Sequence, residues 1–217
     1  AYELMPSLVG SEMCIRDRSW IAEIDEREAE GSLKDQYSKL KEPWGGIDNI
    51  LKIHSLNPKS LAAHVQLYKT VMFGKSPIPR IDREMIALVV SSINQCHYWI
   101  THHGEGLLKL KVDKSLIHQL ISDYKIANIT PAQMAMLDYA SKLTIYPKDM
   151  IREDVERLRE MGYSDRGILD INQIISYFAY VNRIADGLGV ELEDFWNKNG
   201  WLETSDFFCY CLLYTSD

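Results

Sequence analysis

The chain has 217 residues, of which 46% are hydrophobic and 25% are charged, which is typical of a globular protein and excludes collagen-like and disordered classes. The formal net charge is −7, and no run of lysine and arginine offsets it, so the composition argues against nucleic-acid binding. No apolar stretch reaches the roughly 18 residues needed to cross a bilayer, which argues against a membrane protein.

The two ends of the chain differ from its middle. Residues 1–18 have neither helical nor strand periodicity. The stretches SLVGSEMCIRDR and CLLYTSD both resemble translated sequencing adapters. We therefore predict a non-native or disordered head at 1–18, one domain at 19–207, and a non-native or disordered tail at 208–217.

The cysteines follow the same division. Three of the four, Cys14, Cys209 and Cys211, lie in the two ends, which leaves only Cys96 in the predicted domain. The first residues also lack the order of a signal peptide, because the basic residues follow the apolar ones. A single cysteine in such a chain indicates a reducing compartment, so we predict a cytoplasmic protein without a structural disulfide.

Helix signals follow one another along the predicted domain, and no segment alternates as a strand would. A charged amphipathic stretch over 26–41 is followed by a Pro-Trp-Gly-Gly break. Asn57 and Pro58 are a good N-cap and first-turn residue for a helix that ends at Gly74. The stretch 81–93 is apolar on almost every side, which predicts a buried helix.

The remaining helices are predicted from the same signals. They cover 96–111, 113–124, 130–144, 152–161 and a long final stretch from 164 to near 187–189. We find no internal repeat and no linker that would separate a second domain. The sequence therefore predicts a single all-α domain of about eight helices.

One cluster of polar residues on these apolar helices has a chemical meaning. Cys96 and His103 are seven residues apart, so they share one helical face two turns apart, with residue 99 between them. If the helix begins near Cys96, its dipole favours a thiolate there. Glu84 lies on the preceding buried helix, where an unpaired carboxylate is costly. Together these groups would form a proton relay that activates a sulfur nucleophile.

Each residue of the cluster also has a structural interpretation. Cys96 would simply pack, as buried cysteines usually do. His103 would be an interhelical hydrogen-bonding residue, and Glu84 would pair with Arg80 or Arg83 at a helix start. The histidine spacing does not match a metal-binding helix, so we predict no metal site. Surface or packing roles are predicted for three further histidines: His54, His64 and His118.

The cluster carries a family resemblance. Glu84-x11-Cys96-x2-Trp99-x3-His103 resembles the Glu-x11-Cys-x2-Cys-x3-His signature of alkyl hydroperoxidase D-like proteins, in the carboxymuconolactone decarboxylase superfamily. The blocks WGGIDNILKIHSLNP, DREMIALVVSSINQCHYW and YFAYVNRIADGLGVELEDF are similar to its uncharacterised peroxidase-related branch. The resemblance covers about residues 19–196. It implies an alkyl hydroperoxidase D-like helical fold, a homo-oligomer, and thiol-dependent peroxide reduction without haem, metal or another cofactor.

The resemblance also assigns roles to individual residues. Glu84 and His103 match the carboxylate and histidine of the relay, and Cys96 matches the cysteine that closes the disulfide. Trp99 stands where the family has its attacking cysteine, and tryptophan can neither attack a peroxide nor form a disulfide. Two neighbours are expected to support the relay: Tyr98 and His102.

Three explanations of Trp99 remain open. In the first, Cys96 works alone and its sulfenic acid is resolved by an external thiol. In the second, the protein is a non-redox relative, either a lyase that uses His103 and Glu84 or a catalytically silent helical module. In the third, residue 99 is a selenocysteine whose UGA codon has been read as tryptophan, since members of this branch resemble selenoproteins at this position.

The expected partners follow from the resemblance. They are a hydroperoxide substrate, an external thiol or disulfide reductase as electron donor, and further copies of the chain. Neither nucleic acid nor a membrane is expected as a partner.

Overall fold

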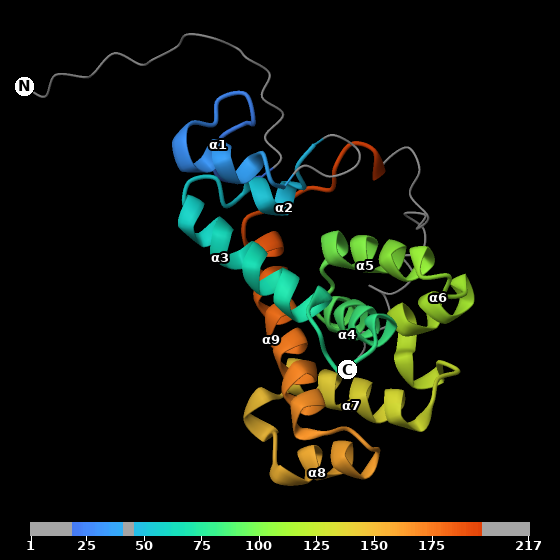
Figure 1. The fold of residues 1–217 in the computed structure, drawn as a ribbon. Coiled ribbons are helices and arrows are strands. Elements are labelled where there is room, and N and C mark those ends of the chain that lie inside the picture. Colours follow the sequence, from blue (N-terminus) through green and yellow to red (C-terminus); the bar gives the residue numbers. More distant parts are fainter. Residues whose placement is uncertain (1–18, 41–45, 197–217) are drawn as a thin grey trace, which may run out of the picture.

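The computed structural model describes residues 19–40 and 46–196, so the predicted head at 1–18 and tail at 208–217 lie outside the described residues. Every regular element in the described ranges is helical, which confirms the all-α prediction (Figure 1). The α-helices are α1 (Gly31–Tyr37), α2 (Asn49–Lys52), α3 (Pro58–Tyr68), α4 (Arg80–Ile93), α5 (His97–Lys109), α6 (Lys114–Asp123), α7 (Pro131–Ile145), α8 (Arg152–Glu160) and α9 (Asp165–Gly187). Short turns of other helix types are η1 (Lys69–Phe73), η2 (Tyr124–Ile126) and η3 (Pro147–Asp149).

Helix α4 is the centre of the fold. It packs against α5, α6, α7 and α9, and Figure 1 shows it between α5 and α7. Residues 85–90 of this helix are all at most 1% exposed. Burial on every side explains why its sequence lacks a polar face, and it confirms the prediction for 81–93.

Helix α3 precedes α4 in the chain and is joined to it through the turn η1. Asn57 caps it by accepting a hydrogen bond from Ser60 N, as predicted. After Tyr68 the helix continues as the π-helical turn η1, and the helical structure ends at Gly74. The Arg83 guanidinium donates to the carbonyl oxygens of Met72 and Gly74, both at 3.0 Å. These bonds satisfy the end of η1 and fix it to the start of α4.

The charged stretch 26–41 was expected to be helical, and it is helical only in part. Within its described residues, 26–40, α1 alone is helical, with Leu33 and Tyr37 buried. A turn in which Glu28 N donates to Asp25 O precedes it. A stretch with so few apolar residues has too little packing to hold a longer helix. The short helix α2 was not predicted.

The chain after α9 packs against the N-terminal part of the domain, at α2. Helix α9 is capped by Ser164, where the last helix was predicted to begin, and runs from Asp165 to Gly187. Gly189 follows with φ +62°. Beyond this turn, Glu191 O accepts a hydrogen bond from Asn49 Nδ2 at 2.9 Å. The segment 190–196 therefore lies against α2, far from it in sequence.

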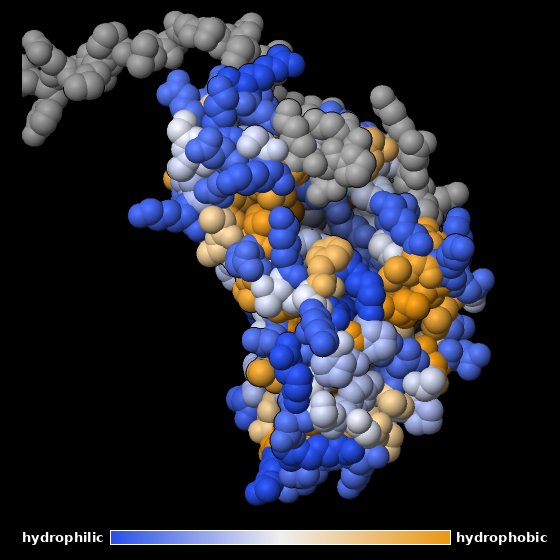
Figure 2. Space-filling view, viewed as in Figure 1, coloured by the Kyte–Doolittle hydropathy of each residue, from blue (hydrophilic) through white to orange (hydrophobic). Residues whose placement is uncertain are grey.

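The surface in Figure 2 is mostly hydrophilic, with a clear apolar patch over the region of α6. Within the described ranges, no helix is both long and apolar enough to span a membrane.

Candidate functional site

The junction between α4 and α5 positions Cys96. Gln95 has φ +57°, which turns the chain sharply. Cys96 is the N-cap residue of α5, so this helix begins near Cys96 as predicted. Its backbone N donates to Ser91 O at 2.9 Å. The thiol is 0% exposed, and its Sγ lies 3.9 Å from Asn182 O. Cys96 is thus a buried free cysteine at a helix start.

The environment of Cys96 differs from the predicted thiolate site. Burial strongly raises the pKa of the thiol, and the nearby Asp186 carboxylate raises it further. The backbone N–H groups of Trp99 and Tyr98 lower this pKa, but by less. Desolvation therefore outweighs the helix start, and Cys96 is a neutral thiol.

Glu84 and His103 form the predicted pair. Glu84 Oε2 is hydrogen-bonded to His103 Nδ1, and Glu84 Oε1 pairs with Arg80, one turn earlier on α4. Burial by itself would raise the pKa of Glu84, but His103 and Arg80 lower it overall. The carboxylate is therefore ionised, although Glu84 is only 2% exposed. His103 Nε2 is buried and has no hydrogen-bond partner among the described residues.

Gly106 leaves room for this carboxylate. A Cβ on Gly106 would lie 3.0 Å from Glu84 Oε2, and this carboxylate is fixed by its bonds to His103 and Arg80. Alanine in a helix is normally about 1 kcal/mol better than glycine. We expect Gly106→Ala instead to lower the free energy of unfolding by about 1–2 kcal/mol in chemical denaturation, because of overpacking.

Gly187→Ala is the matched control for that substitution. Nothing lies within 4 Å of a Cβ at Gly187, in the last turn of α9. It should leave stability unchanged or raise it by less than about 1 kcal/mol. A similar gain in stability in both variants would contradict the contact described for Gly106.

Trp99 fills the position next to the relay. Its ring stacks on His103, with centroids 5.3 Å apart and an interplanar angle of 18°. Its Nε1 donates to Val181 O at 3.2 Å, and Phe178 packs edge-on against both rings. Trp99 is 5% exposed, with its polar atom satisfied.

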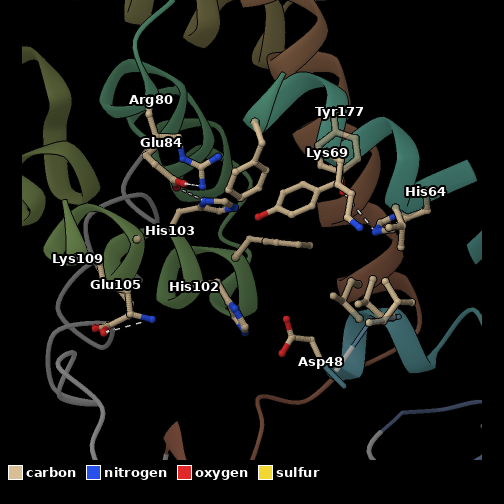
Figure 3. A pocket seen from close by; sticks show the side chains of 18 of the residues that line it. Asp48, His64, Lys69, Arg80, Glu84, His102, His103, Glu105, Lys109 and Tyr177 are labelled. Atoms are coloured by element: carbon tan, nitrogen blue, oxygen red, sulfur yellow. Dashed lines mark hydrogen bonds and ion pairs between the residues drawn. The ribbon is translucent and has the colours of Figure 1, made fainter. Parts of the chain in front are cut away.

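A pocket of about 950 Å³ opens beside these residues (Figure 3). Of the predicted site residues, Glu84, Trp99, His102 and His103 line it. Cys96 and Tyr98 do not line it. The pocket is bounded by side chains from α2, α3, η1, α4, α5 and α9, and by Leu40, Asp48, Phe195 and Trp196. Its aromatic lining residues are Tyr68, Phe73, Trp99, Tyr177, Phe195 and Trp196.

A second buried carboxylate stands behind the pocket wall. Glu193 is 2% exposed and accepts four hydrogen bonds, two on each oxygen. Asn49 N and Tyr98 Oη each donate to Oε1 at 2.8 Å. On Oε2, Trp196 Nε1 donates at 2.9 Å and His102 Nε2 lies at 3.1 Å. Burial would raise the pKa of Glu193, but these donors, His102 first, lower it to about 2.

Sequence reasoning found part of this site. It named Glu84, His103 and residue 99, and it gave Arg80 only as a structural partner of Glu84. It missed Glu193, because an acidic residue after a helix is usually on the surface. It also missed that His64 lines the pocket. Across residues 19–40 and 46–196, no group of three or more histidine, cysteine or acidic side chains is arranged to hold a metal ion.

Several known proteins are similar to this chain in fold and in sequence. Residues 58–142 match the carboxymuconolactone decarboxylase family. An uncharacterised peroxidase-related protein from Silicibacter sp. TM1040 is 31% identical, with a TM-score of 0.73 over 82% of this chain and 93% of that protein. The chain belongs to the alkyl hydroperoxidase D-like group of the carboxymuconolactone decarboxylase superfamily.

Two further relatives extend the comparison. The alkylhydroperoxidase AhpD core protein from Ralstonia eutropha JMP134, also an uncharacterised peroxidase-related protein, is 26% identical, with a TM-score of 0.74 over 81% of this chain and 93% of that one. Sestrin-3 of Mus musculus is 26% identical over 177 residues, or 78% of this chain. This alkyl hydroperoxidase D-like chain spans only 34% of the length of Sestrin-3.

Proposed function

We propose that the pocket is the active site of a hydroperoxide reductase whose attacking group is a cysteine or selenocysteine at position 99. The observation that carries this proposal is that residue 99 lines the pocket and stacks on His103, which is bonded to Glu84. A sulfur or selenium atom there would lie beside an imidazole that exchanges protons with it. The carboxylate orients that imidazole through Nδ1.

The proposed cycle uses residue 99 and Cys96, which lie three positions apart at the start of α5. The thiolate at 99 attacks a peroxide oxygen, the O–O bond breaks, and an S–O bond forms. The alkoxide leaves as an alcohol with a proton from His103, and residue 99 becomes a sulfenic acid. The Cys96 sulfur, after its proton passes to the relay, attacks that sulfenic sulfur, forming a disulfide and releasing water. An external dithiol then reduces the disulfide and is itself oxidised to one.

The burial of Cys96 suits the resolving role better than the attacking one. A resolving thiol needs to reach only the residue three positions later at the same helix start, which a disulfide can span. An attacking thiol must instead meet the substrate as a thiolate. Cys96 does not line the pocket, and burial raises its pKa. We therefore infer that Cys96 does not work as a solitary peroxidatic cysteine, and that redox activity requires sulfur or selenium at 99.

A second candidate function is favoured by one observation. His103 Nε2 is buried without a hydrogen-bond partner among the described residues, next to a pocket that lacks a reactive thiol. With Trp99 as the natural residue, the Glu84–His103 pair would act as the base of a non-redox lyase. A UGG codon for residue 99 in the source gene, together with decarboxylase activity, would favour this candidate.

The deciding experiment restores the sulfur. We expect Trp99→Cys to gain hydroperoxide-dependent oxidation of an added dithiol, followed as peroxide loss. Trp99→Ser makes a similar cavity without a thiol and should have no such activity. Adding Cys96→Ser to Trp99→Cys should remove the intramolecular disulfide, so that peroxide without dithiol leaves one sulfenic acid per chain at residue 99. Absence of peroxide loss in a folded Trp99→Cys protein would overturn the proposal.

The remaining expectations accompany this proposal. The reductant would be a thiol or disulfide reductase, the protein would assemble into a homo-oligomer, and it would work in the cytoplasm.

A further inference from the structure

Two adjacent residues of α5 each carry an imidazole bonded to a buried glutamate. His103 is bonded to Glu84, and His102 is bonded to Glu193. Both histidines line the same pocket, and Figure 3 shows them extending from α5 to different parts of its wall. The pair expected from the sequence is Glu84–His103. The Glu193–His102 pair has the same chemistry and lies outside the predicted relay.

The Glu193 carboxylate determines the state of the His102 ring. Glu193 accepts hydrogen bonds from neutral donors on both oxygens and is ionised, so it has no proton to give. His102 Nε2 must therefore carry the hydrogen in their 3.1 Å contact. In a neutral ring the lone pair then lies on Nδ1. This tautomer is assigned from the carboxylate partner.

His102 is the more accessible of the two imidazoles. Its side chain is 17% exposed, whereas that of His103 is 4% exposed and is covered by Trp99 and Phe178. No hydrogen bond occupies His102 Nδ1 within the part of the chain that the structure describes. The ring is also held in place, stacked on Tyr98 at 4.4 Å and met edge-on by Trp196 at 5.2 Å.

The pocket walls indicate the class of ligand. Six aromatic side chains line a volume of about 950 Å³, which fits a small aromatic molecule. Aromatic walls offer stacking, and charged side chains such as Asp48, Lys69 and Arg80 line other parts of the pocket. An accessible nitrogen acceptor on an aromatic wall would orient a bound ring. The group that an Nδ1 lone pair recognises is an O–H or N–H donor.

We propose that His102 is a second base of this pocket, positioned by Glu193, which accepts the proton of an O–H or N–H group on an aromatic ligand. The proton moves from the ligand to His102 Nδ1, so the ligand becomes an anion and the ring an imidazolium. Glu193, at 3.1 Å, balances the new positive charge. The inference rests on the pocket being the active site of the proposed function, where it specifies aromatic hydroperoxides, but it does not depend on sulfur at residue 99.

The test uses the full chain with Trp99 and the probe 4-nitrophenol, whose absorption moves to longer wavelength on ionisation. At a pH where the free phenol is mostly protonated, the protein should increase the phenolate band on binding. His102→Ala should lose this band, and Glu193→Gln should reduce it, because the amide no longer stabilises the imidazolium. Glu191→Gln, an exposed carboxylate in the same segment, should leave it unchanged.

The readouts separate this role from a structural one. Circular dichroism identifies variants that are still folded, and His102→Gln is the second variant if Glu193→Gln does not fold. Three results would overturn the proposal: no phenolate band with the unsubstituted protein, an unchanged band in folded His102→Ala, or a band lost in His103→Ala but kept in His102→Ala. None of them depends on peroxide loss by Trp99→Cys, so the two proposals fail separately.

Discussion

Glu84→Gln is expected to lower the free energy of unfolding by about 3 kcal/mol. The wild-type carboxylate is 2% exposed and is paired on one oxygen with Arg80 and on the other with His103. The amide keeps the shape but not the charge, and it has one acceptor oxygen instead of two, so either Arg80 or the His103 ring loses its acceptor. Urea denaturation with a constant m-value measures the change.

Glu105→Gln is the matched control for Glu84→Gln. Glu105 lies on the next helix and lines the same pocket, but its ion pair within the described residues is with the exposed Lys109, at 3.8 Å. Such surface pairs contribute less than about 1 kcal/mol, so little change is expected. Equal losses in the two variants would show that the buried ion pair adds nothing beyond a surface one. A Glu84→Gln protein as stable as the wild type would contradict the pairing itself.

Acid is expected to destabilise the protein in a step that begins well above the range of ordinary carboxylates. His64 is 5% exposed, and its pKa is lowered from 6.5 to about 4, mainly by burial and further by His54, whose ring lies 4.6 Å away. Above pH 6.5 neither state of His64 is protonated. As the pH falls from 6.5 to about 4, only the unfolded chain takes up the proton on His64. The contribution of His64 to the free energy of unfolding therefore declines by about 3 kcal/mol over this range and changes no further below it.

His64→Gln should remove most of this step, measured as the free energy of unfolding at several pH values. The exposed His118 provides the control, and His118→Gln should keep the step. A second decline is expected below pH 4.5, because the lowered pKa of Glu193, about 2, stabilises the folded state only above the ordinary carboxylate range. A wild-type stability that is flat between pH 6.5 and 4 would contradict the buried state of His64.

The sequence predicted the elements whose signals are local. Asn57 and Ser164 are caps that act within one turn, and the continuous apolar run of α4 predicts that this helix is buried. The prediction for 26–41 was too long, because an amphipathic pattern with few apolar residues does not hold a long helix without packing. The turn η1 could not be predicted, since it depends on Arg83 reaching back to the carbonyls of Met72 and Gly74.

Some residues of the candidate site could likewise be predicted from local signals, and others could not. Glu84 and His103 were predictable because two adjacent helices bring them together at a fixed spacing. The raised pKa of Cys96 was not, since a helix start alone suggests the opposite shift, and only the tertiary packing shows that burial dominates. Glu193 and Asn49 are 144 residues apart, and no local pattern links them.

The chain after α9 has a consequence for how this protein can diversify. Glu84 and His103 lie within the family-matched stretch 58–142, whereas Asp48, Tyr177 and Trp196 reach the pocket from outside it. Part of the pocket wall, and Glu193 behind it, are therefore encoded outside the matched stretch. Sequence change in the flanking segments can reshape the pocket while the Glu84–His103 pair stays intact, so relatives that share the central helices need not bind the same ligands.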